Sequence, residues 1–128
     1  MALDPDLVEA WVNLGGTLLL KWDFAGSAEA NREALRRRDD LATAHYNLGQ
    51  AYLYQGDAQA LADCCARVVG LEPEHAAGHY FLAVGLLALG RVPEARAAVA
   101  RATTLGHRPQ PDFLRRLEQA EASRTQTA

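Results

Sequence analysis

Apolar residues recur at intervals of three and four positions along most of the chain, which is the spacing of one face of an α-helix. This pattern predicts six helices in three consecutive pairs, over residues 6–20 and 24–38, 41–55 and 58–71, and 74–89 and 93–105. In the second and third pairs, Gly56 and Gly90 follow the first helix, and glycine is the usual residue just beyond a helix end. Trp22 and Asp23 stand at this place in the first pair, so the first turn must form without glycine.

The helical pattern repeats every 34 residues. When the chain is shifted by this period, Leu14 aligns with Leu48 and Leu82. Further aligned sets are Trp11, His45 and His79; Gly15, Gly49 and Ala83; Leu18, Tyr52 and Leu86; and Ala34, Val68 and Ala102. A fixed period of this size is typical of stacked helical hairpins. The pattern therefore predicts repeats over residues 6–39, 40–73 and 74–107, with residues 1–5 as a lead-in or as the tail of a preceding repeat.

Small residues occupy one aligned column, at Gly15, Gly49 and Ala83. They predict the places where the two helices of each pair approach closely, because a larger side chain would hold the helix axes apart. Aromatic residues near this column, such as Trp11 and Tyr52, are then expected in the core.

The repeat pattern changes after Gly106. Residues 108–123 carry Phe113, Leu114 and Leu117 at helical spacing, which predicts a final helix that caps the apolar side of the third repeat. Residues 124–128 have no packing signal and are expected to be a flexible tail. The first predicted helix has no comparable cover. We therefore expect that the chain comes from a longer array, or that this face meets another protein or a second copy.

Composition and charge narrow the possible partners. The 128 residues carry a net charge of −3, which disfavours attraction to nucleic acid or to acidic membranes.

Cys64 and Cys65 are neighbours and cannot easily form a disulfide with each other, so we expect reduced thiols. The acidic N-terminal stretch lacks the features of a secretory signal, and no run of about 18 apolar residues could cross a membrane. These observations favour a cytoplasmic protein.

No catalytic or cofactor motif stands out in the sequence. His75 and His79 are four residues apart on a predicted helix and could present two imidazoles to a metal, but a metal site needs further ligands. His79 also occupies one of the aligned columns. We therefore expect structural histidines, no bound metal or cofactor, and no enzymatic activity.

The aligned columns resemble the tetratricopeptide repeat motif, in which Trp, Leu, Gly and Tyr on one helix are followed by Ala, an aromatic residue, Ala and Pro on the next. The matching residues are Trp11, Leu14, Gly15, Leu18, Ser27, Asn31, Ala34 and Asp39; His45, Leu48, Gly49, Tyr52, Leu61, Cys65, Val68 and Pro73; and His79, Leu82, Ala83, Leu86, Ala95, Val99, Ala102 and His107. The resemblance implies an all-α fold, a right-handed α-solenoid of three such repeats plus a C-terminal capping helix. Asn31 departs from the motif, because a core aromatic is usual there, so we expect the first repeat to pack less well on its second helix.

In this family the first helices of the repeats line a concave groove, where partner segments usually bind. The resemblance places the groove at Val12, Asn13, Gly16 and Leu19; at Tyr46, Asn47, Gln50, Leu53 and Tyr54; and at Tyr80, Val84 and Leu87. Asn13 and Asn47 are equivalent, and an amide can both donate to and accept from a peptide backbone. The groove positions carry no Lys or Arg, which disfavours a clamp for a partner's C-terminal carboxylate.

The apolar and aromatic lining favours an apolar or amphipathic partner segment. The alternative for these side chains is packing within the solenoid or under the final helix. The leading hypothesis for the function is a non-enzymatic scaffold or adaptor that binds a protein or peptide segment. Two other interpretations stay open, namely an accessory repeat region of a larger multidomain enzyme, such as a transferase, and a scaffold that associates with itself through the uncapped first helix.

Overall fold

The computed structural model describes residues 7–126. This part of the chain forms seven helices and contains no strand. They are α1 (Val8–Leu20), α2 (Phe24–Arg37), α3 (Ala42–Gln55), α4 (Ala58–Leu71), α5 (Ala76–Ala88), α6 (Val92–Thr104) and α7 (Pro111–Gln126). The ends of the first six lie within two residues of the predicted ranges, so the hydrophobic spacing located each helix pair.

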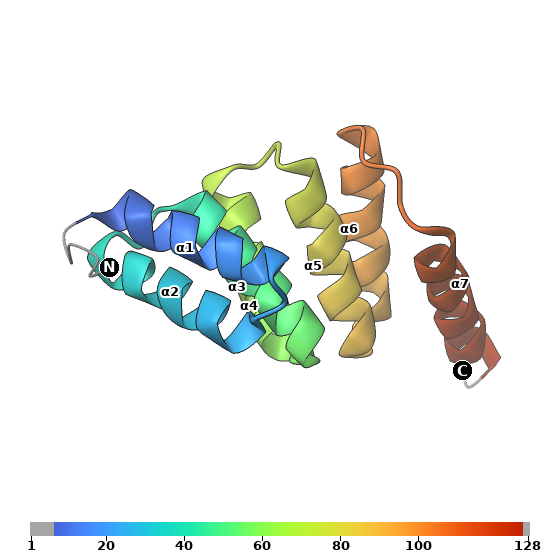
Figure 1. Cartoon of the computed structure of the whole chain (residues 1–128). Helices are drawn as coiled ribbons and strands as arrows, with labels where there is room; N and C mark the ends of the chain where they lie inside the picture. Colours follow the sequence, from blue (N-terminus) through green and yellow to red (C-terminus); the bar gives the residue numbers. More distant parts are fainter. Residues whose placement is uncertain (1–6, 127–128) are drawn as a thin grey trace.

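Consecutive helices pack side by side as hairpins, α1 with α2, α3 with α4, and α5 with α6 (Figure 1). The hairpins also contact each other, because α2 packs against α3, α4 packs against α5, and α1 touches α3. They follow one another along the molecule toward α7 at the right of the view. This arrangement is an all-α solenoid of stacked hairpins, which confirms the predicted fold class.

A close approach within the first hairpin requires the glycine at position 15. A Cβ atom on the buried Gly15 would lie 2.3 Å from the amide nitrogen of Asn31. Asn31 is fully buried, and its amide donates to the Ser27 carbonyl oxygen at 2.9 Å. The Ser27 hydroxyl in turn donates to the Gly15 carbonyl oxygen at 2.7 Å. Polar contacts therefore hold α2 against α1 at the place where the repeat motif has an aromatic ring.

Two aligned histidines tie their helices to the preceding junctions. Nε2 of His45 lies 2.8 Å from the carbonyl oxygen of Asp39, and Nε2 of His79 lies 2.8 Å from the carbonyl oxygen of Pro73. Because a carbonyl oxygen only accepts, each Nε2 carries the proton that it donates. The contact of His79 supports the structural role predicted for it.

The turns inside the hairpins use left-handed backbone conformations. Gly56 after α3 has a φ of 77° and Gly90 after α5 has a φ of 78°, which glycine adopts without steric cost. At the equivalent place after α1, Trp22 has a φ of 65°, a conformation that a Cβ atom disfavours. Asp23 then caps α2, because its carboxylate accepts from the Gly26 N–H at 2.9 Å.

The last helix completes the core of the third hairpin. Phe113 and Leu117 of α7 are buried in the same cluster as Tyr80 and Val99, which agrees with the predicted capping role. The helix runs to Gln126, three residues beyond the end predicted from the sequence. The predicted lead-in at residues 1–5 and the last two residues of the predicted tail lie outside the described residues.

Candidate protein-interaction surface

The first part of the predicted groove lies between α1 and α3. Val12 and Asn13 line a pocket of about 180 Å³ between α1 and the start of α3. A Cβ atom on Gly16 would lie 3.8 Å from the amide nitrogen of Asn47, so the two helices bring these positions together. Neither Asn13 nor Asn47 forms a side-chain hydrogen bond within the described residues. Both amides are therefore available to a ligand.

Two adjoining pockets continue this face across α3, α5 and α7. Leu53 and Val84 line the first pocket, of about 120 Å³, where α3 ends and α4 begins. Val84 and Leu87 line the second pocket, of about 400 Å³, between α5 and α7. Because Val84 and Ala88 line both pockets, the apolar surface is continuous from one to the other.

The last helix and the residue before it add side chains that the sequence analysis did not place in the groove. Four of them line the second pocket: Gln110, Asp112, Phe113 and Arg116. They lie outside the aligned columns of the repeat, and their position against α5 depends on how α7 packs. Only the apolar spacing of α7 was visible in the sequence, and it carried no signal for Gln110 or Arg116.

Tyr46 connects α3 with α5. Its ring centroid lies 5.0 Å from that of His75 and 6.1 Å from that of Phe81. Burial raises the pKa of the Tyr46 phenol, and the nearby Cys65 adds to the increase. The side chain is half-buried, so it supports the stacking of two repeats and presents only part of its surface to the groove.

Tyr80, which the sequence analysis expected in the groove, is among the residues that line the outer pocket, but most of its side chain is buried in the core. It is only 5% exposed, and its ring centroid lies 5.4 Å from that of Phe113 and 4.5 Å from that of His107. The backbone N–H of Gln110 donates to its hydroxyl at 3.4 Å. Burial raises the pKa of this phenol. The segment after α6 and the start of α7 cover the ring, which is the alternative that the sequence left open.

The other predicted positions differ in their accessibility. Tyr54 is 64% exposed and stacks on Phe24 with a centroid distance of 4.7 Å. Leu19 is half-buried and packs against the cluster that contains Leu48. Gln50 is also half-buried, and its amide nitrogen has no hydrogen-bond partner within the described residues. Leu19 therefore serves the core, whereas Tyr54 is open to a partner.

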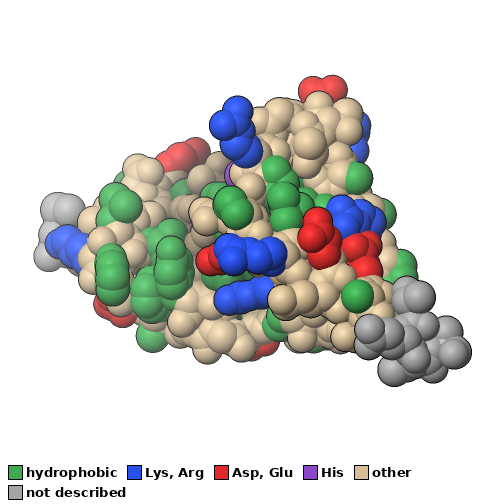
Figure 2. Space-filling view, turned by 90° about the vertical axis from the view of Figure 1, so that its right-hand side faces the viewer, with side chains coloured by type: hydrophobic (Ala, Val, Ile, Leu, Met, Phe, Trp, Pro, Cys, Tyr) green, Lys and Arg blue, Asp and Glu red, His purple; other side chains and the backbone are tan. Residues whose placement is uncertain are grey.

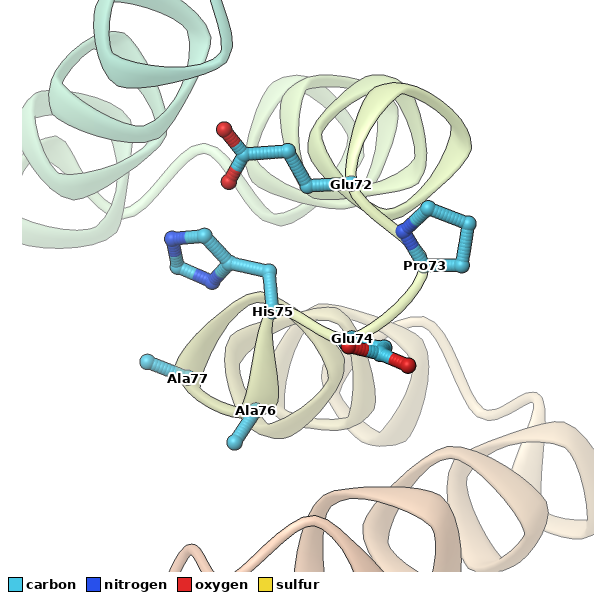
Figure 3. Close-up of a pocket in the computed structure, with 6 residues that line it drawn as sticks. All are labelled: Glu72, Pro73, Glu74, His75, Ala76 and Ala77. Atoms are coloured by element: carbon cyan, nitrogen blue, oxygen red, sulfur yellow. The ribbon is translucent and has the colours of Figure 1, made fainter.

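A further open pocket, of about 670 Å³, lies at the junction of α4 and α5 (Figure 3). The side chains of Glu72 and His75 point to the same side of this junction. The His75 ring is already engaged, because Nδ1 accepts from the Gly78 N–H at 2.8 Å and the ring packs on Tyr46. Among residues 7–126, no three His, Cys, Asp or Glu side chains are grouped so that they could hold a metal ion.

Each pocket of the groove has a charged residue in its lining, namely Glu9, Asp57, or Asp112 with Arg116. Arg116 lines the outer pocket, and Asp112 next to it pairs with Arg115. Figure 2, which looks at the side at the right of Figure 1, shows charged side chains of both signs toward the viewer and a group of hydrophobic side chains at the left. No helix in the described part of the chain is long and apolar enough to cross a membrane.

The architecture of this chain is similar to that of several solved structures. No family model and no curated protein matches the sequence. The NMR structure of the first tetratricopeptide repeat domain of human RPAP3 superposes with a TM-score of 0.83 at 16% identity, over 98% of this chain and 100% of that one. The chain has the tetratricopeptide repeat fold.

Two further solved structures are similar. The first tetratricopeptide repeat domain of Spaghetti (RPAP3), bound to the HSP90 peptide SRMEEVD, superposes with a TM-score of 0.81 at 12% identity, over 96% of this chain and 97% of that one. MamA superposes with a TM-score of 0.76 at 19% identity, over 80% of this chain and 60% of its own. In the tetratricopeptide repeat fold of this chain, α1, α3 and α5 are the first helices of the three repeats.

Proposed function

We propose that this protein is a non-enzymatic interaction module that binds an apolar or amphipathic segment of a partner protein along α1, α3 and α5. The observation that carries the proposal is the continuous apolar surface of Leu53, Val84, Ala88 and Leu87 across two adjoining pockets. Concave apolar surfaces with a few polar groups are typical of binding sites. The apolar side chains of the partner segment would occupy these pockets.

Two amides would set the direction of the bound segment. Asn13 and Asn47 form no side-chain hydrogen bond with any residue of the part of the chain that the structure describes, so each can donate to and accept from an extended backbone. A similar domain, that of Spaghetti, was solved with an HSP90 peptide bound, which supports a peptide ligand for this fold. That peptide is acidic, whereas the predicted groove positions of this chain carry no Lys or Arg, and the outer pocket is lined by Asp112 as well as Arg116. We therefore propose an apolar ligand in place of an acidic one.

Peptide display against the immobilised chain tests the proposal, followed by affinity measurements on the selected peptides. Leu53→Ala combined with Leu87→Ala should weaken binding by on the order of 2 kcal/mol, because both side chains line the pockets. Leu105→Ala is a matched control, since Leu105 is also half-buried but follows α6, outside the groove. Thermal denaturation shows whether the variants stay folded. Equal losses of affinity in the control and the double variant would contradict the proposal, as would a failure to select any peptide.

A further inference from the structure

An apolar ridge surrounds the turn between α1 and α2. We define the turn ridge as Leu20, Trp22, Phe24 and Tyr54. Leu20 is 82% exposed, Trp22 is 80% exposed and Tyr54 is 64% exposed. Phe24 stacks on Tyr54 with the ring planes 8° apart, so the first turn and the end of α3 form one surface.

Trp22 has an unfavourable backbone conformation. The equivalent turns use Gly56 and Gly90, with φ of 77° and 78°, whereas Trp22 has a φ of 65°. This conformation is disfavoured for any residue with a Cβ atom. The indole gains little burial in return, because most of its surface is exposed. Strain of this kind in a side chain that is mostly exposed is typical of residues that serve an interaction.

Stacking of further hairpins would not cover the ridge. Gly56 occupies the equivalent turn of the middle hairpin, which has a hairpin packed on each side. It is nevertheless exposed. The turns therefore lie along an open edge of the solenoid, and a hairpin stacked on α1 would leave Trp22 open in the same way.

We propose that the turn ridge is the contact surface of a symmetric dimer, in which a second copy of this chain covers it. Charge complementarity favours this occupant. Lys21 and Asp23 flank Trp22, and Lys21 forms no ion pair within the described residues. In a two-fold arrangement the surface meets its own reversed copy. Each Lys21 then faces the partner's Asp23, and the apolar side chains meet between the two pairs. Tyr54 is also a predicted groove position, but it does not line the two adjoining pockets that carry the proposed function. The dimer therefore does not depend on binding in those pockets.

Analytical ultracentrifugation of the full chain, from micromolar to near-millimolar concentration, tests the dimer. We expect a reversible dimer of modest affinity, because a ridge of four side chains makes a small interface. Trp22→Gly should raise the dissociation constant at least about tenfold. The same variant should melt at the same or a higher temperature, because glycine relieves the turn. Loss of the dimer with retained stability would separate association from folding.

Two controls identify the surface and its charges. Leu7→Gln alters an exposed leucine outside the ridge and should leave the dimer intact. Lys21→Glu places like charges opposite each other, so it should weaken the dimer about tenfold at low salt and less at high salt.

Three results would overturn the proposal. They are a chain that is monomeric at every concentration, a dimer that survives Trp22→Gly, and a dimer that Leu7→Gln abolishes. A monomeric chain whose tryptophan emission shifts on adding phosphatidylcholine vesicles, while that of the Trp22→Gly variant does not, would assign the ridge to a lipid surface instead.

Discussion

At the scale of single residues, Gly15 and Gly16 are neighbours on α1 with opposite surroundings. A Cβ atom on Gly15 would lie 2.3 Å from the Asn31 amide, whereas on Gly16 the nearest neighbour, the Asn47 amide, would be 3.8 Å away. Gly15→Ala should therefore lower the free energy of unfolding by about 1–3 kcal/mol. Gly16→Ala should raise it by about 0.5–1 kcal/mol, because alanine favours the helix. Urea denaturation measures both, and equal effects would argue against the close approach of α1 and α2.

The adjacent thiols of α4 make stability depend on pH in the alkaline range. Burial raises the pKa of Cys64 to about 11 and that of Cys65 to about 12, so the unfolded chain loses these protons at lower pH than the folded protein does. The resulting stabilisation is complete below about pH 8.5 and is lost as pH rises toward the folded values. Urea midpoints measured across this range should fall. Replacing both cysteines by alanine should make the fall shallower, and an unchanged slope would show that the thiols titrate normally.

At the scale of the elements, each hairpin turn depends on one left-handed residue. Gly90→Ala should lower the free energy of unfolding by about 1–2 kcal/mol, because alanine resists this conformation. Trp22→Gly should raise it by up to about 1 kcal/mol, since the greater freedom of glycine in the unfolded chain offsets part of the relief. Thermal denaturation compares the two variants. A loss of stability in Trp22→Gly would mean that the indole supports the fold.

The capping helix is held by two unequal kinds of contact. Phe113 is buried against Tyr80, whereas Arg96 and Glu121 form an exposed ion pair at 2.6 Å. Phe113→Ala should lower the free energy of unfolding by about 3–4 kcal/mol, and Arg96→Gln should lower it by less than about 1 kcal/mol. Hydrogen exchange should show that Phe113→Ala loosens α7 and the adjoining part of α5 first. Similar effects of the two changes would show that α7 is attached through its surface.

At the scale of the whole molecule, binding in an apolar groove should depend little on salt. The net charge is −3, and Arg116 is the cation that lines the outer pocket. Raising the ionic strength from about 0.05 to 0.5 M should therefore change the dissociation constant of a groove peptide by less than about threefold. Isothermal titration calorimetry at several salt concentrations measures this. A steep loss of affinity would indicate that the ligand is held by charge.

The candidate groove was only partly visible in the sequence. The 34-residue period assigned Val84 and Leu87 to the same face as Leu53, and the structure places them along adjoining pockets. Tyr80 belongs to the same aligned set as Val12 and is nevertheless buried. The difference arises because α7 covers the third repeat alone, and a periodic pattern treats all repeats alike.

The sequence by itself determined the helices, their pairing and the all-α solenoid, because hydrophobic spacing and turn residues act over a few positions and the 34-residue period repeats them. The tertiary structure alone decided which side chains of that periodic face stay accessible. It placed α7 over Tyr80 and left Trp22 exposed in a strained turn. Accessibility depends on contacts between residues far apart in the chain, and such contacts leave no local pattern in the sequence.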